Sequence, residues 1–209
     1  MSEAVVDSHA HSAVKQPAES PVTPESWGKL GMWVFLAGDA MSFGGLLAGY
    51  GAMRASSPDW PNPLEALGIE LTAFMTFLLI VSSFTMVKAL SAAKHSDLPN
   101  FRKYLLLTII VGTVFLGLQA YEWTHLTHVG MTMSGNPWGA PLFGTTFYIL
   151  TGFHGCHVFG GVVYLTCVLF TGMNGRFLGE NSSPVEIVGL YWHFVDLVWI
   201  LVFTFVYLL

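Results

Sequence analysis

The chain has 209 residues, of which 53% are hydrophobic and only 10% are charged. A soluble globular domain carries about 25% charged residues, so this composition excludes an ordinary soluble protein and predicts an integral membrane protein. The net charge is -5 and the few Lys and Arg residues form no basic patch, so we expect no nucleic-acid partner.

Residues 1–25 contain no sustained apolar run. They are predicted to be a disordered cytoplasmic tail, and not a signal peptide, because no basic region leads into an apolar one. Residues 26–209 are predicted to be a single transmembrane domain without an internal repeat.

Five apolar segments follow the tail, at about residues 27–53, 67–93, 104–123, 142–171 and 185–209. Each is long enough to cross a bilayer, which takes about 20 helical residues. Backbone polar groups within hydrocarbon must be paired inside their own segment. The predicted fold class is therefore all-α, a bundle of five transmembrane helices.

The orientation of the bundle is predicted from its eight Lys and Arg residues. With a cytoplasmic N-terminus, all of them except Arg54 lie on the inner side. Cytoplasmic loops are the ones enriched in Lys and Arg, so we expect the N-terminus inside and the C-terminus outside.

Ionisable residues lie near the middle of three predicted helices, where they cost several kcal/mol unless they find partners. These residues are Asp39 in the first helix, His154 and His157 in the fourth, and His193 and Asp196 in the fifth. Members of each pair are three residues apart and so project from one face of their helix. Asp39 lies about 18 Å from the start of its helix. All of these groups are expected to share one layer.

That layer admits several interpretations. The simplest is interhelical hydrogen bonding that holds the bundle together. A proton path through Asp39, a bis-His haem, and a metal site made of three His with a carboxylate are the alternatives.

Glu122 lies near the outer end of its helix and is expected to reach the interface. Gly45 and Gly49 form a small-residue face that fits either internal packing or a subunit contact. Two cysteines, Cys156 and Cys167, are expected to be small buried residues.

Four stretches of the sequence resemble motifs of one known protein family, and they occur in the same order as in that family. They are LGMWVFLAGDAMSF at 30–43, GLQAYEW at 117–123, TGFHGCHV at 151–158 and YWHFVDLVW at 191–199. Together they resemble the signature stretches of subunit III of haem–copper terminal oxidases, in the short five-helix bacterial type. The matching motif residues include Gln119, Glu122, Trp123, Tyr191, Trp192 and Trp199.

The resemblance implies a non-catalytic core subunit of a proton-translocating respiratory oxidase that reduces O2 to water, in the bacterial inner membrane. It implies no haem and no metal in this chain, because the haems and copper are carried by partner subunits. It also implies direct packing on subunit I, assembly with other subunits such as subunit II, bound phospholipid, and support for proton uptake and for the stability of subunit I.

Two departures from the family pattern stand out. Asp39 occupies the position where the family usually has an intramembrane Glu that reacts with carbodiimide, so Asp39 is the proton-related candidate here, with a side chain one methylene shorter. The first two helices of the larger members are missing. The alternatives are a component of a quinol oxidase or nitric oxide reductase and, in another class, a free-standing membrane cytochrome that uses the mid-membrane His residues.

Overall fold

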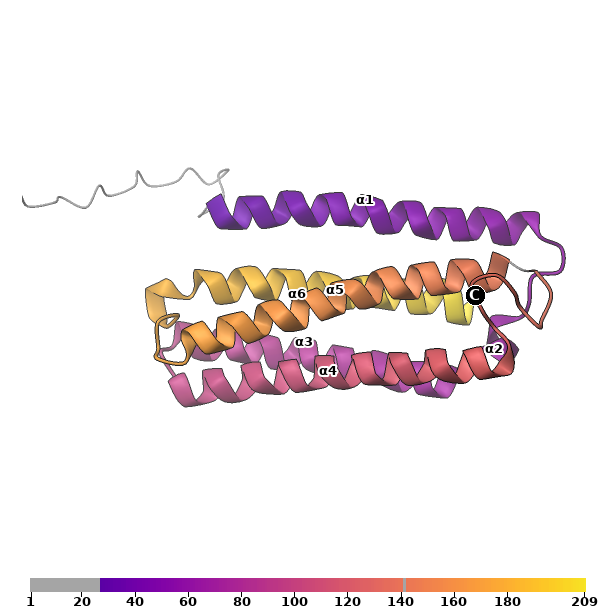
Figure 1. The fold of residues 1–209 in the computed structure, drawn as a ribbon. Helices are drawn as coiled ribbons and strands as arrows, with labels where there is room; N and C mark the ends of the chain where they lie inside the picture. Colours follow the sequence, from indigo (N-terminus) through magenta and orange to yellow (C-terminus); the bar gives the residue numbers. More distant parts are fainter. Residues whose placement is uncertain (1–26, 141) are drawn as a thin grey trace, which may run out of the picture.

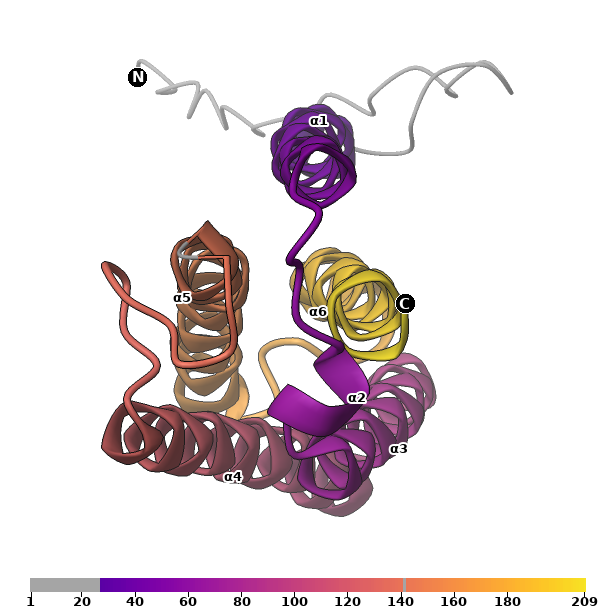
Figure 2. The same cartoon turned by 90° about the vertical axis from the view of Figure 1, so that its right-hand side faces the viewer.

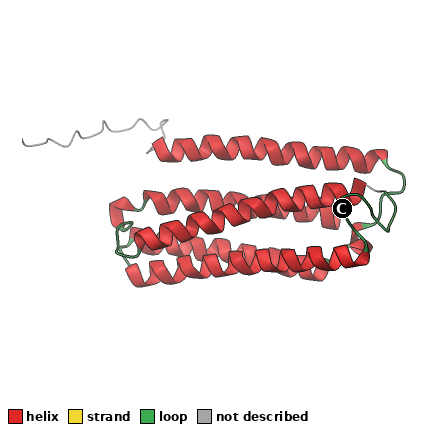
Figure 3. Ribbon diagram, in the orientation of Figure 1, coloured by secondary structure: helices red, strands yellow, loops and turns green. Residues whose placement is uncertain are grey.

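The computed structural model describes residues 27–140 and 142–209. The predicted tail at residues 1–25 lies outside them. Five helices are long and apolar enough to cross a membrane, and the described residues contain no strand (Figure 3). The prediction of an all-α protein with five membrane helices is therefore confirmed.

The five spanning elements alternate with short connections. They are α1 (Trp27–Ser56), α3 (Ile69–Lys94), α4 (Leu98–Val129), α5 (Leu142–Gly172) and the last span, which combines η1 (Gly179–Asn181), α6 (Ser183–Val202) and η2 (Phe203–Leu208). The final turns in η2 are π-helical. The loop between α1 and α3 contains the short helix α2 (Pro63–Ala66), which the apolar pattern does not indicate.

Helix α4 is longer at both ends than the apolar segment 104–123 that marks it. It begins after Asp97, whose side chain accepts a hydrogen bond from the backbone N–H of Asn100 at 3.2 Å. Pro99 in the first turn has no N–H to leave unpaired. The helix ends at Gly130, which adopts a φ of 100°, a left-handed conformation that Gly reaches without strain. Hydropathy marks only the part of a helix inside hydrocarbon, whereas capping sets its ends.

Helices α3, α4, α5 and α6 form the compact part of the bundle, and α1 lies along α5 and α6 on its outside (Figures 1 and 2). Only 11% of the most apolar window of α1 is buried, against 50% for the last span. In the interior, the ring of Trp192 lies so close to α4 that a Cβ on Gly112 would come within 2.6 Å of it. Glycine at that position lets the two helices meet.

The outer surfaces of α1 and α5 bear on two expectations, the burial of the two cysteines and the use of the small-residue face of α1. Cys156 and Cys167 are exposed rather than buried, because both lie on the outward face of α5. A Cβ added to Gly45 or Gly49 would meet no described atom within 4 Å. The small-residue face of α1 is therefore not used for packing among the described residues.

Candidate functional site

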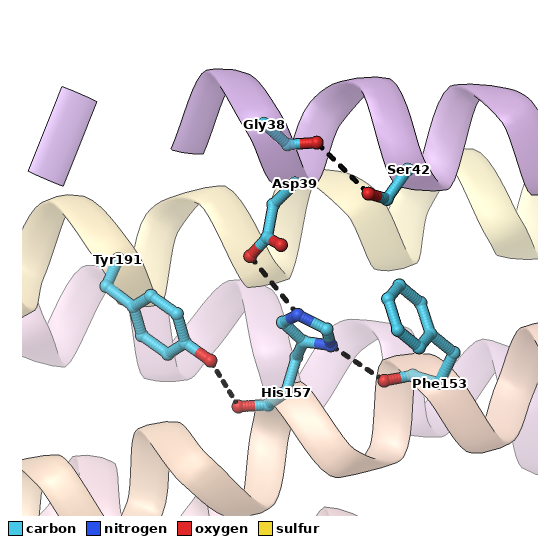
Figure 4. A network of polar contacts seen from close by, with 6 residues as sticks. All are labelled: Gly38, Asp39, Ser42, Phe153, His157 and Tyr191. Carbon is cyan, nitrogen blue, oxygen red and sulfur yellow. Dashed lines mark hydrogen bonds and ion pairs between the residues drawn. The ribbon is translucent and has the colours of Figure 1, made fainter. Parts of the chain in front are cut away.

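The candidate site lies where α1 meets α5 and α6, and it is centred on Asp39 and His157 (Figure 4). The Oδ2 atom of Asp39 is 3.1 Å from Nε2 of His157. The other ring nitrogen, Nδ1, is 2.8 Å from the backbone oxygen of Phe153. A carbonyl oxygen only accepts, so Nδ1 carries a proton. The contact at Nε2 then holds one further proton, either on the imidazole or on the carboxyl group, and both arrangements leave the pair with no net charge.

Aromatic side chains and a third helix enclose this pair. The rings of Phe43 and His157 have centroids 5.1 Å apart, and those of Phe153 and His157 are 4.7 Å apart. From α6, the hydroxyl of Tyr191 donates to the backbone oxygen of His157 at 2.9 Å. The pair thus joins α1 to the bundle at a depth where a net charge would cost several kcal/mol.

His193 and Asp196 form a separate cluster with Ser83 of α3. The Ser83 hydroxyl donates to Oδ2 of Asp196 at 2.7 Å. Its oxygen lies 3.1 Å from Nδ1 of His193, which is the donor in that contact because the single hydroxyl proton is already used. These contacts join α6 to α3.

His154 belongs to neither cluster. Its side chain is fully buried, and neither ring nitrogen has a hydrogen-bond partner among the described residues. It is packed against the rings of Trp199, at 4.8 Å between centroids, and Phe115, at 5.8 Å. These residues therefore do not form one hydrogen-bonded cluster. The structure separates the five groups into an Asp39–His157 pair, a Ser83-bridged pair and a His held only by aromatic rings. In the described part of the chain, no three His, Cys, Asp or Glu residues are grouped as metal ligands.

Glu122 does not reach the interface, contrary to expectation. It is 4% exposed and accepts hydrogen bonds from Thr72 of α3 at 2.9 Å and from the hydroxyl of Tyr207 of η2 at 3.1 Å. Because α4 continues to Val129, Glu122 is not at the end of its helix, and its face points inward. This network ties the last turns of the chain to α3 and α4.

The other motif residues make direct interhelical contacts. Gln119 donates from Nε2 to the backbone oxygen of Thr151 at 2.7 Å. Trp192 donates to Ser82 at 3.0 Å, and Trp199 donates to Thr76 at 3.0 Å. The indole nitrogen of Trp123 is buried without a partner among the described residues.

Sequence reasoning missed the partners on α3, which are Thr72, Thr76, Ser82 and Ser83. A signal was available, because these hydroxyl residues recur at close to helical spacing in an otherwise apolar segment. In membrane helices, Ser and Thr at such positions commonly bond to neighbouring helices.

Five apolar helices held together by buried polar and aromatic pairs define a multi-pass integral membrane protein. Comparison with known families matches residues 23–209 to the family model for cytochrome c oxidase subunit III. The chain belongs to the cytochrome c oxidase subunit III family, which confirms the resemblance seen in its motifs.

Several bacterial relatives cover most of the chain. It is 36% identical to a cytochrome c oxidase subunit 3 from Bacillus subtilis, across 86% of this chain and 85% of that protein. It is 35% identical to a cytochrome c oxidase subunit 3 from Thermostichus vulcanus, across 86% of each. It is 34% identical to a probable cytochrome c oxidase subunit 3 from Nocardia farcinica, across 94% of each. The chain is thus a subunit of an oxidase complex and works together with other subunits.

Proposed function

We propose that this chain is the non-catalytic subunit III of a proton-translocating haem–copper oxidase that reduces O2 to water in a bacterial inner membrane. It packs on subunit I, which carries haem and copper, in a complex that includes subunit II. The chain itself holds no haem and no metal. Family membership and the bacterial relatives support this proposal.

The observation that carries the partner assignment is the unpacked outer face of α1. Large apolar side chains on this helix are exposed, with Met41 at 79% and Trp33 at 56%. On the same helix, added Cβ atoms at Gly45 and Gly49 meet nothing within 4 Å. Small residues let a second helix approach closely, so α1 is suited to pack against a helix of subunit I.

The Asp39–His157 pair supports the proposed role in proton uptake. Asp39 lies on α1, the helix assigned to the partner contact. With one proton at Nδ1 and one at the contact between Nε2 and Oδ2, the pair has no net charge. A proton gained or lost there leaves a charge at mid-membrane, which couples the pair to proton movement nearby. The exposed apolar surfaces of the bundle are the proposed sites of bound phospholipid.

The surroundings of His154 support the proposal that this chain carries no haem. Both of its ring nitrogens are enclosed, and the ring lies against Trp199. A haem ligand needs an open nitrogen directed at the iron. His157 and His193 are engaged with Asp39 and Ser83 instead.

The proposal is tested by purifying a tagged chain in mild detergent and recording reduced-minus-oxidised absorption spectra before and after partner subunits are stripped away. We expect the haem signal to leave with a large partner. Gly45→Leu should reduce the copurified haem several-fold, because the new side chain blocks close helix approach. Gly117→Leu is the matched control, since Gly117 also faces open space, but on α4.

Haem that stays with the stripped chain would overturn the proposal and favour a free-standing cytochrome. Equal haem yields from the Gly45 and Gly117 variants would refute the contact through α1, but not the assignment as subunit III. A copper-binding domain among the copurified subunits identifies cytochrome c as the electron donor, whereas its absence favours the quinol oxidase or nitric oxide reductase alternative.

A further inference from the structure

A groove of about 300 Å³ opens on the outer surface between α4 and α5, and neither Asp39 nor His157 lines it. Leu116 and Trp123 of α4 and the exposed ring of Phe159 of α5 form its apolar walls. Gly152 and Gly155 form part of its floor.

The two glycines let side chains of α4 lie close to α5. A Cβ on Gly155 would lie 2.9 Å from Oε1 of Gln119, and a Cβ on Gly152 would lie 3.1 Å from the ring of Trp123. At the first distance Gln119 would have to shift, and at the second Trp123 would have to move by a few tenths of an ångström. The lack of side chains at these positions therefore lets Gln119 and Trp123 lie close against α5.

Gln119 directs an unused hydrogen-bond acceptor into the groove. Its side chain is 5% exposed, and Nε2 donates to the carbonyl oxygen of Thr151, which fixes the orientation of the amide. Oε1 accepts no hydrogen bond from any described residue, yet it is not sealed off from the groove.

The depth of Gln119 makes this free acceptor costly. The residue lies about 15 Å from the C-terminal end of α4, within the hydrocarbon part of a bilayer, where water does not pair polar groups. An acceptor left unpaired there is destabilising.

We propose that this groove binds one membrane-soluble molecule that carries a hydroxyl group on a flat apolar ring. The ring lies between Trp123 and Phe159, and the hydroxyl donates to Oε1 of Gln119. The positive end of an O–H dipole complements the partial negative charge of Oε1, whereas an acyl chain offers no donor. Two kinds of molecule have this chemistry, a quinol and a polycyclic lipid alcohol.

The test uses the intact oxidase complex in phosphatidylcholine nanodiscs, kept under argon so that added quinol stays reduced. Tritiated duroquinol and tritiated cholesterol are the two probes. Their methyl ethers are the matched probes that cannot donate a hydrogen bond. We expect saturable binding of one probe and not of its ether, and binding about tenfold weaker in Gln119→Leu. The difference between wild type and this variant removes the contribution of any site on another subunit.

Phe159→Ala provides a second variant, because Phe159 is 61% exposed and its loss leaves the helix contacts in place. It should weaken binding several-fold, while Phe170→Ala, on the exposed surface of the same helix, should not. Saturation by duroquinol identifies the quinol type, and saturation by cholesterol identifies the polycyclic type. The proposal is overturned if neither probe saturates, if the ethers bind equally well, or if Phe159→Ala binds like wild type.

Discussion

At the scale of single residues, the ionisable groups within the membrane are each accommodated differently. Asp39 and His157 pair with no net charge, and Glu122 accepts hydrogen bonds from two hydroxyl groups. His154 is instead surrounded by aromatic rings. Buried polar groups are generally paired, so His154 is the exception among these residues.

Replacing Glu122 by Leu should destabilise the protein by about 1–3 kcal/mol, because the hydroxyls of Thr72 and Tyr207 lose their acceptor. Tyr207→Phe should cost less, since it removes one donor and leaves the bond from Thr72. Thermal unfolding of the purified complex measures both effects. Glu70→Leu, at an exposed position, is the control and should change little. A Glu122 variant as stable as this control would contradict the inward role of Glu122.

Asp39 should be the carboxyl group of this chain that reacts with a hydrophobic carbodiimide. The reagent attacks a protonated carboxyl group, and the proton shared with His157 supplies one within the membrane. Mass spectrometry should locate the adduct on Asp39 and find none there in Asp39→Asn. His157→Phe should label more strongly, because a carboxyl group alone in hydrocarbon stays neutral. Labelling confined to other carboxyl groups would show that the shared proton is not available.

At the scale of helices, α3 is the element that connects the others. Its hydroxyl side chains contact α4 and α6, through Thr72, Thr76, Ser82 and Ser83. By contrast, α1 is attached mainly along one edge, through the Asp39–His157 pair and an ion pair of 3.0 Å between Lys29 and Glu186. This difference explains why α1 is the more loosely packed helix, with 11% of its most apolar window buried against 39% for α3.

The stability of the first turn of α4 should depend on pH. Hydrogen bonds from the side chain of Asn100, at 2.6 Å, and from its backbone N–H lower the pKa of Asp97. Since the pKa is lower in the folded state, the stabilisation is complete above the unfolded-state value of about 3.9. It is lost as the pH falls through the folded-state pKa.

Asp97→Ala should therefore lower the melting temperature at pH 7, and the gap to wild type should close in acid. Asp97→Asn still caps a helix but does not titrate, so its stability should not follow this acid transition. A constant difference between wild type and Asp97→Ala at every pH would rule out the ionised cap.

At the scale of the whole molecule, basic residues are concentrated at one end of the bundle. Lys29 and Lys94 both lie within 4 Å of Glu186, so the start of α1, the end of α3 and the start of α6 meet there. Arg102 and Lys103 lie in the first turns of α4, which begins at the same end. This arrangement underlies the proposed orientation with that end in the cytoplasm.

Cysteine labelling tests the orientation. In a background without Cys156 and Cys167, Ser134→Cys in the loop before α5 should react with a membrane-impermeant maleimide in intact cells. Asn174→Cys, in the loop after α5, should react only after the membrane is permeabilised. Both positions are exposed, so they differ only in the side of the membrane. The reverse pattern would invert the proposed topology.

The sequence alone determined the five spans, the basic end and the family, because hydropathy, charge and short motifs are local properties of the chain. Only the tertiary structure decided that His157 meets Asp39, that Glu122 points inward and that Gly45 points outward. In a bilayer both the core-facing and the lipid-facing sides of a helix are apolar, so no hydrophobic stripe indicates how each helix is rotated. That rotation, and with it the partner of every polar side chain, is set by packing between helices.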